Sequence, residues 1–441
     1  MVTTEGRGAV GDIERLLRRL TRFLLRHSAE GAFELRDTVR QVAAAYGAEA
    51  EILAIAEGAV LTLRDSDDTS RCAAIRVNPE LARLDLVAEG KFLVRRIIAG
   101  QLSAVAAEEE LIRLERRPAP YPPWLRAAGV VLFSVGFAPS VQATWTEIGY
   151  SVVLGAVMAV VFVLAERLAV LRVLLPIGGP VLVGLVAFGL LHAERQPGGP
   201  MILMVPALFV LIPGDFLCAA TAEIAVGQLT PGAVRLAQAA FTLVEIAAGV
   251  LVAAEISGVG TGGLFEAAVP PALPVALIVA SWVPFVVGLA LTFSARMGDV
   301  PWMLALTYLA WGVQFGMTRW VGPTAGTFVA AALLAVAAGY LEISASRPPR
   351  IVLILGGFFA LTVGALALRG LTTIDGGFTI QGFNDIRDAI TQTAALTLGL
   401  VVGAAPVQAV VASRVRRMAA DGQLAGADGM TGAGGFPAPP G

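Results

Sequence analysis

The chain has 441 residues, of which 56% are apolar and 15% charged, and its net charge is -2. Soluble globular proteins carry about 25% charged residues, so this composition excludes an ordinary soluble protein. The small net charge gives no basic footprint for nucleic acid. Two cysteines and two histidines, without metal-site spacing, predict neither a disulfide framework nor a metal site, and we expect no cofactor.

Residues 1–117 hold much of the charge and predict a small α+β domain. Helical periodicity predicts four helices, at 12–27, 33–46, 80–99 and 103–116. Short strand-like runs follow the second helix, at 51–56, 59–63 and 73–77. The first helix is amphipathic and basic without an uncharged apolar core, so we expect no signal peptide. We expect this domain to lie in the cytoplasm.

A basic, proline-rich linker at 118–124 leads into a membrane region. Ten apolar segments are long enough to cross a bilayer, at 125–142, 147–165, 170–192, 199–214, 231–256, 271–294, 300–318, 321–341, 350–370 and 386–412. We group them into two five-helix halves, 125–256 and 271–412. Residues 419–441 are rich in Gly, Ala and Pro and predict a disordered tail.

The distribution of arginine predicts the orientation of these segments. Loops on the N-terminal side and the stretch after the last segment contain Arg167, Arg172, Arg235, Arg296, Arg347, Arg350, Arg414, Arg416 and Arg417. The opposite loops contain Arg195, Arg319, Arg369 and Arg387. Because arginine is enriched on the cytoplasmic side, we expect both termini in the cytoplasm.

The fourth and ninth segments resemble each other. Residues 206–214 align with residues 356–364, which matches Phe209 with Phe359 and Gly214 with Gly364. The two segments lie five apart, so the halves are expected in opposite orientations, as in transporters built from inverted repeats. Chance similarity between segments rich in Leu, Phe and Gly is the alternative.

Glycine and proline predict broken helices in three segments. Pro206, Pro213 and Gly214 interrupt the fourth segment, and Gly356-Gly357 interrupts the ninth. The third contains Pro176, Gly178, Gly179 and Pro180. In lipid, broken backbone is tolerated where it is buried or lines a cavity, although Gly and Pro are also common in membrane helices. Three small-residue motifs, Gly312/Gly316, Gly322/Gly326 and Gly399/Gly403, predict close helix packing within the chain.

Glu245 is the main candidate for a functional residue, because it lies midway along the fifth segment. A carboxylate at that depth costs at least ~2.5 kcal/mol unless it is paired or hydrated. It could carry a proton or bind a substrate amine; a structural carboxyl bonded to a neighbouring helix is the alternative. Asp215 follows the break in the fourth segment and is expected to cap a helix at 216–226. Helix N–H groups there could bind a substrate carboxylate.

The N-terminal domain also contains Ser28, His27 and several aspartates, residue types that a hydrolase could use. The sequence has no G-x-S-x-G motif, metal-ligand spacing or phosphate loop. A regulatory or gating domain is therefore favoured, and we do not expect an enzyme.

Four stretches resemble the threonine/serine exporter family of bacterial inner-membrane proteins. They are residues 31–47, 93–103 with 120–122, 212–215 with 227–235, and 348–370. The resemblance implies a cytoplasmic domain followed by two five-helix halves. The family usually has Pro-Gly where this chain has Val363-Gly364, which weakens a site role for that position.

These features together predict an α-helical polytopic membrane protein of the cytoplasmic (inner) membrane. By the resemblance, it is expected to export threonine and serine as a proton-coupled antiporter working by alternating access. Candidate substrate- and proton-binding residues are Glu245, Asp215, Gly214, Pro213, Pro206, Gly364 and Gly357. The expected partners are a small amino acid, protons and the lipid bilayer, and a homo-oligomer stays open. The alternatives are export of a dicarboxylate such as succinate, a membrane-anchored hydrolase or sensor acting through the N-terminal domain, and a structural membrane protein without cargo.

Overall fold

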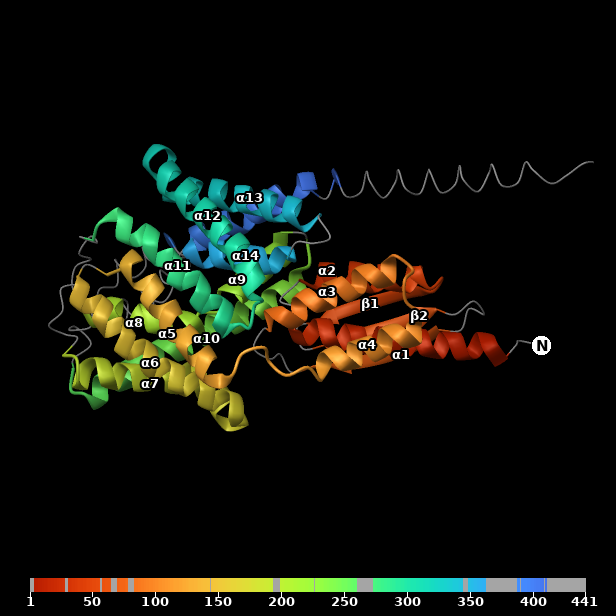
Figure 1. The fold of residues 1–441 in the computed structure, drawn as a ribbon, viewed down its shortest axis with the longest axis horizontal. Helices are drawn as coiled ribbons and strands as arrows, with labels where there is room; N and C mark the ends of the chain where they lie inside the picture. Colours follow the sequence, from red (N-terminus) through yellow and green to blue (C-terminus); the bar gives the residue numbers. More distant parts are fainter. Residues whose placement is uncertain are drawn as a thin grey trace, which may run out of the picture.

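The computed structural model describes residues 4–27, 31–55, 58–64, 70–77, 83–142, 144–192, 199–225, 227–259, 273–343, 348–361, 387–388, 390–407 and 409–410. Within these ranges the chain forms a small unit of helices and strands, which we call the N-terminal unit, and a larger helical bundle beside it (Figure 1).

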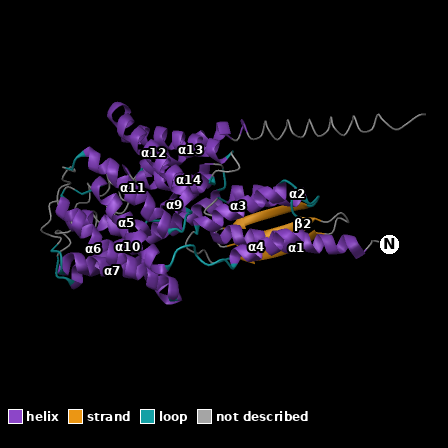
Figure 2. Cartoon of the chain, in the orientation of Figure 1, coloured by secondary structure: helices purple, strands orange, loops and turns teal. Residues whose placement is uncertain are grey.

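The N-terminal unit is a three-stranded antiparallel sheet with four helices packed against it (Figure 2). The strands are β1 Glu49–Ile55, β2 Gly58–Arg64 and β3 Ser70–Arg76, in the order β1-β2-β3. The helices are α1 Thr4–His27, α2 Ala32–Ala45, α3 Leu84–Ile98 and α4 Ala104–Glu115. Ile52 and Leu61 are buried under the helices, whereas Leu53 is 67% exposed, so one face of the sheet carries the core.

The helices and strands of this unit have the predicted order and type, but α1 begins eight residues and β3 three residues earlier than predicted, and α3 begins four residues later. A two-residue connection joins β1 to β2, since Ile55 pairs with Gly58. Gly100 separates α3 from α4 with a φ of +69°, a conformation that favours glycine. Ser103 then caps α4 by accepting a hydrogen bond from the Ala106 N–H at 3.3 Å. These turn residues explain why the boundary between α3 and α4 could be predicted.

The bundle begins after the proline-rich linker. Its first helices are α5 Pro123–Phe137, α6 Trp145–Arg167, α7 Ala169–Gly189, α8 Gly199–Leu208, α9 Gly214–Ala225 and α10 Leu229–Ile256. The later ones are α11 Val275–Thr292, α12 Val300–Val321, α13 Pro323–Glu342, α14 Arg350–Ala360 and a helix at Ile390–Val407. Short 3-10 turns lie at Ala138–Ser140, Phe209–Leu211 (η3) and Met297–Asp299.

Among the described residues, six helices are long and apolar enough to span a membrane: Trp145–Arg167, Val170–Gly189, Leu229–Ile256, Val275–Thr292, Pro323–Glu342 and Ile390–Val407. Two shorter apolar helices occur at Gly199–Leu211 and Arg350–Ala360, in the predicted fourth and ninth segments. The protein is thus a polytopic helical membrane protein. The total of ten spans stays a prediction.

Two predicted helix breaks are wrong. The helix α7 is continuous through Pro176 and Pro180. Gly249 of α10 approaches the Ile177 carbonyl so closely that a Cβ placed on this glycine would lie 2.5 Å from the oxygen, so α10 packs tightly against α7 beside its prolines. The helix α14 likewise runs through Gly356-Gly357 and ends at Ala360.

Glycines set how the bundle helices pack. Gly129 of α5 approaches Leu291 while Gly136 approaches Phe285, so α5 and α11 are antiparallel. The helix α10 is parallel to α7, and the helix at 390–407 is parallel to α13, against which Gly399 and Gly403 pack as predicted. The prediction fails for Gly312 and Gly316, because no described atom lies within 4 Å of a Cβ placed on either.

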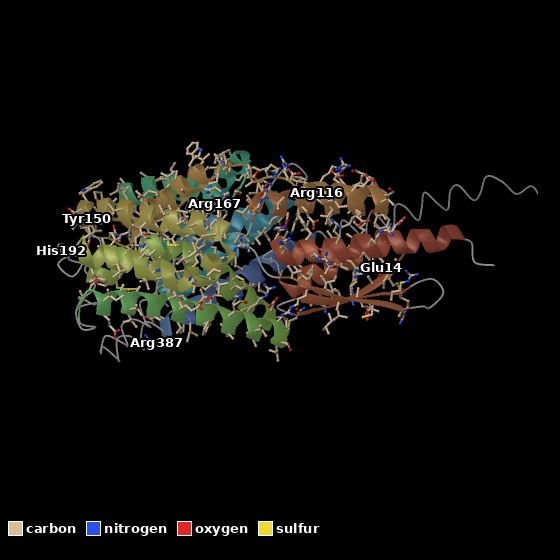
Figure 3. All side chains as sticks on the ribbon, turned by 90° about the horizontal axis from the view of Figure 1, so that it is seen from below. Glu14, Arg116, Tyr150, Arg167, His192 and Arg387 are labelled. Atoms are coloured by element: carbon tan, nitrogen blue, oxygen red, sulfur yellow. The ribbon has the colours of Figure 1, made fainter. Side chains whose placement is uncertain are left out.

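The N-terminal unit contacts one end of the bundle. The Leu84 N–H donates to the Phe293 carbonyl at 2.9 Å, and Glu34 pairs with Arg350. Lys91 and Arg95 reach Glu342 at the end of α13 at 3.6 and 3.8 Å. Tyr150 and His192 lie at the opposite end of the bundle, and Arg167 lies closer to the N-terminal unit (Figure 3).

Candidate functional site

The fourth segment is broken next to Pro213 and Gly214 as predicted, whereas its helix is continuous through Pro206. The helix α8 contains Pro206, passes into η3, and gives way to non-helical backbone at Ile212-Pro213 before α9 starts at Gly214. Pro206 and Pro213 are both buried. The first hydrogen bond of α9 runs from the Leu217 N–H to the Pro213 carbonyl at 3.1 Å, so the N–H groups of its first residues have no partner within the helix.

A cluster of aromatic rings surrounds the break, and we call it the central aromatic cluster. Its members are Phe133 and Phe137 of α5, Phe209 of η3, Phe285 of α11 and Phe359 of α14. The rings of Phe137 and Phe209 stack with centroids 3.9 Å apart, and Phe209 meets Phe359 edge-on at 5.4 Å. The two residues aligned between the fourth and ninth segments are therefore in contact.

The predicted site glycines of the ninth segment have packing roles. A Cβ on Gly357 would lie 2.9 Å from Leu334 of α13, and one on Gly356 would lie 2.4 Å from the Thr307 hydroxyl of α12. Both residues let α14 approach its neighbours closely. Gly364 lies outside the described residues.

Asp215 is the second residue of α9, not the cap of a later helix as predicted, because the helix already begins at Gly214. Gly214 and Asp215 together form the first turn after the break. The same turn offers N–H groups to an anionic ligand.

Glu245 lies on α10 at the border between its packed and exposed faces. Leu243, Ile246 and Val250 of the same helix are buried, whereas Phe241 is 64% exposed and Glu245 is half-buried. Among the described residues no hydrogen bond or ion pair to its carboxyl is found. The packed face of α10 lies against α7 and α9, so Glu245 sits at the edge of that contact, not at its centre.

The depth of Glu245 can be compared with that of the break. Gly232 of α10 lies against Ala220 and Ile224 of α9, which fixes the register of this antiparallel pair. With a rise of about 1.5 Å per residue, Gly214 is about 12 Å and Glu245 about 20 Å further along the bundle from that contact. The two residues therefore lie within about 8 Å of one level.

Other polar side chains inside the bundle make interhelical hydrogen bonds. The Gln142 amide donates to the Ser151 hydroxyl at 2.7 Å, and Gln314 donates to Thr327 at 2.9 Å. These contacts match the role expected for such residues in membrane helices. In the part of the chain that the structure describes, no cluster of three His, Cys, Asp or Glu residues could hold a metal ion.

Sequence reasoning missed the aromatic residues of α5 and α11, and the glycines that bring these helices together. A signal was present, since Phe133-Ser-Val-Gly136 and Phe285-Val-Val-Gly288 share the pattern F-x-V-G. The pattern lies in unbroken helices, so a comparison of the broken segments alone does not reveal it.

Comparison with known proteins gives two matches. The model of a family described as "Putative threonine/serine exporter" matches residues 15–257. A "Probable threonine/serine exporter" of Mycobacterium tuberculosis is 25% identical over 339 residues, which cover 72% of this chain and 61% of that protein. The chain thus spans about three fifths of that relative's length. No solved structure matches.

Proposed function

The chain belongs to the threonine/serine exporter family, and from this premise we propose that it is a secondary transporter that exports small polar amino acids, threonine and serine first. The observation that carries the proposal is the family match across residues 15–257, which includes both the N-terminal unit and the broken fourth segment. Transport proteins tolerate irregular backbone at membrane depth where it lines a path.

The proposed architecture is two inverted halves of five spans each. The antiparallel packing of α5 on α11, the first helices of the two halves, supports opposite orientations. The third and fifth spans of each half also pack alike, because α10 is parallel to α7 and the helix at 390–407 is parallel to α13. Alternating access would then expose the fourth and ninth segments to each side in turn.

The N-terminal unit is proposed to lie in the cytoplasm. It contacts Arg296 through Glu89 at 3.7 Å and Arg350 through Glu34, both in loops that the arginine distribution assigns to the inner side. The exporter would thus have both termini on the cytoplasmic side of the membrane. The contacts also favour a gating role for this unit, since its ion pairs join the ends of α11, α13 and α14.

The substrate site is proposed at the break of the fourth segment. A zwitterion needs a donor group for its carboxylate and an acidic group for its amine. The first turn of α9, at Gly214 and Asp215, supplies N–H groups, and Pro206 and Pro213 expose the backbone there. Glu245 lies within about 8 Å of that level and is proposed to exchange protons or to meet the amine. Gly357 and Gly364 are proposed to shape the matching part of the ninth segment.

The energy source is proposed to be the proton gradient, because the sequence contains no phosphate-binding loop. A carboxyl that can be neutral in the membrane and charged when hydrated suits proton exchange. The amino acid would leave the cell as protons enter.

Proteoliposomes holding the purified full chain test this proposal. Flux of labelled threonine, serine and succinate is measured under an imposed pH gradient. We expect threonine and serine to move and succinate not to. Glu245→Gln should lower amino-acid flux more than 10-fold, whereas Glu255→Gln, at the exposed end of the same helix, should not. Transport of succinate but not of threonine or serine would show that the cargo is a dicarboxylate. Unchanged amino-acid flux in Glu245→Gln would show that Glu245 has no part in the mechanism.

A further inference from the structure

The contact between α5 and α11 is reciprocal. A Cβ placed on Gly136 of α5 would lie 2.3 Å from the backbone nitrogen of Phe285, and one on Gly288 of α11 would lie 2.3 Å from the backbone nitrogen of Phe133. The glycine of each F-x-V-G pattern thus lies against the phenylalanine of the other pattern. Such mutual contacts are what a two-fold relation between the halves produces.

The two halves also contain matching contacts between their third and fifth helices. Gly249 of α10 approaches the Ile177 carbonyl of α7, where a Cβ would lie 2.5 Å from the oxygen and 2.9 Å from the Cβ of Pro180. Gly399 approaches the Phe328 carbonyl of α13 at a corresponding 2.4 Å and lies 2.8 Å from the Cβ of Ala331. An offset of 150 to 152 residues relates these contacts between the halves, because it takes Gly249 to Gly399, Ile177 to Phe328 and Phe133 to Phe285.

Backbone contact of this closeness restricts how α5 and α11 can move. Sliding α5 along α11 by about one turn, 5.4 Å, would bring Leu132 or Phe133, which share a helix face with Gly136, to a place that has no room for a Cβ. Rotation about the contact keeps the glycines together. The rings of Phe133 and Phe285 stack beside it with centroids 4.8 Å apart, which adds to the resistance against sliding.

The fourth and ninth segments both pack against this contact. Phe209 of the fourth segment and Phe359 of the ninth both meet Phe133, with ring centroids at 5.8 and 5.5 Å. Phe209 and Phe359 meet α5 through ring contacts, whereas α5 and α11 also meet through backbone at Gly136 and Gly288. The aromatic contacts can therefore separate during transport, whereas the glycine contact between α5 and α11 cannot.

We propose that the α5–α11 contact is the fixed axis of the transport cycle, with Gly136 and Gly288 as the positioning residues that hold it. The two halves turn about this contact, and the fourth and ninth segments move against it. This inference rests on the proposed transport function but names its geometry, and it excludes a cycle in which one half slides along the other.

A disulfide across the contact tests the inference. In a full chain carrying Cys72→Ser and Cys218→Ser, Gly129→Cys and Leu291→Cys are introduced, because a Cβ on Gly129 would lie 2.7 Å from that of Leu291. A disulfide needs about 3.5–4.5 Å between these atoms, so the helices must part by about 1 Å. Disulfide formation is measured by mass spectrometry, and flux is compared in proteoliposomes before and after oxidation.

The reduced double-cysteine protein is expected to transport more slowly than its parent, because the new Cβ crowds the contact. We expect the disulfide to form and the oxidised protein to keep at least half of that reduced flux, because the linked points do not separate. Loss of flux on oxidation, restored by a reductant, would mean that the halves slide and would overturn the inference. Failure of the disulfide to form under a strong oxidant would overturn it too, since the backbones would not be adjacent.

A second measurement uses single substitutions. Gly288→Ala is expected to lower the maximal flux more than 10-fold with little change in the KM for threonine, because the axis and not the site is altered. Gly149→Ala, where no described atom lies within 4 Å of the new Cβ, is the control. Unchanged flux in Gly288→Ala would contradict the inference. Transport of succinate instead of threonine by the wild-type protein would contradict only the proposed cargo. The ratio of variant to wild-type flux would then be measured with succinate.

Discussion

Substituting alanine for Gly249 and Gly399 should destabilise the protein by similar amounts. A Cβ at these positions would lie 2.5 and 2.4 Å from a backbone carbonyl oxygen, whereas ordinary contacts begin near 3.4 Å. The helices must therefore part by nearly 1 Å, and such overpacking costs about 1–3 kcal/mol. Alanine returns about 0.5–1 kcal/mol through its better helix propensity. The net loss is about 0–2.5 kcal/mol for each variant.

The assay is thermal unfolding of the detergent-purified protein, followed by intrinsic fluorescence. Gly312→Ala is the matched control, because this glycine also lies inside a bundle helix but has open space at its Cβ. It should gain about 0.5–1 kcal/mol. If Gly249→Ala and Gly399→Ala behaved like the control, the close contacts would be refuted. If only one of them destabilised the protein, the two helix pairs would not be equivalent.

Three further predictions concern single contacts. Reversing the charge of Glu34 or of Arg350 alone should weaken docking of the N-terminal unit by about 0.2–1 kcal/mol, because both side chains are partly exposed. Reversing both charges together should restore the docking. Limited proteolysis of the linker measures the docking, and no recovery in the double variant would refute the ion pair. Tyr121→Phe should lower the melting temperature at neutral pH, because the hydroxyl donates to the Ala295 carbonyl at 2.7 Å. Burial, aided by nearby aspartates and opposed by a backbone hydrogen bond, raises the pKa of Tyr121 above 10.0. The stabilisation by this tyrosine is therefore complete below pH 10 and is lost as the pH rises through the raised pKa. A difference in melting temperature between the wild-type protein and Tyr121→Phe that grew above pH 10 would contradict this. Phe209→Ala should cost about 3–5 kcal/mol in the same unfolding assay, and a loss below 1 kcal/mol would show that the aromatic cluster is loosely packed.

Local signals were sufficient for the N-terminal unit and for the broken fourth segment. Gly100 and Ser103 define a turn through their own conformations, and Pro206 and Pro213 act on the backbone that contains them. Such effects depend on a few adjacent residues, so a single sequence reveals them.

Tertiary packing decided the cases in which prediction failed. The helix α7 stays continuous through Pro176 and Pro180, and Gly249, far along the chain, packs against it beside Pro180. Gly356 and Gly357 serve close packing against α12 and α13 instead of a break. Sequence placed Glu245 correctly at mid-helix but could not tell that it borders the exposed face of α10. These outcomes depend on which helices become neighbours, and periodicity carries no such information.

Proton movement driven by a threonine gradient tests the central claim most directly. Vesicles containing the full chain and a pH-sensitive dye are given threonine on one side, with no other gradient imposed. The account predicts a pH change in the direction opposite to threonine flow, which is absent in vesicles carrying Glu245→Gln. Threonine flow without any pH change, or the same pH change in both proteins, would contradict it.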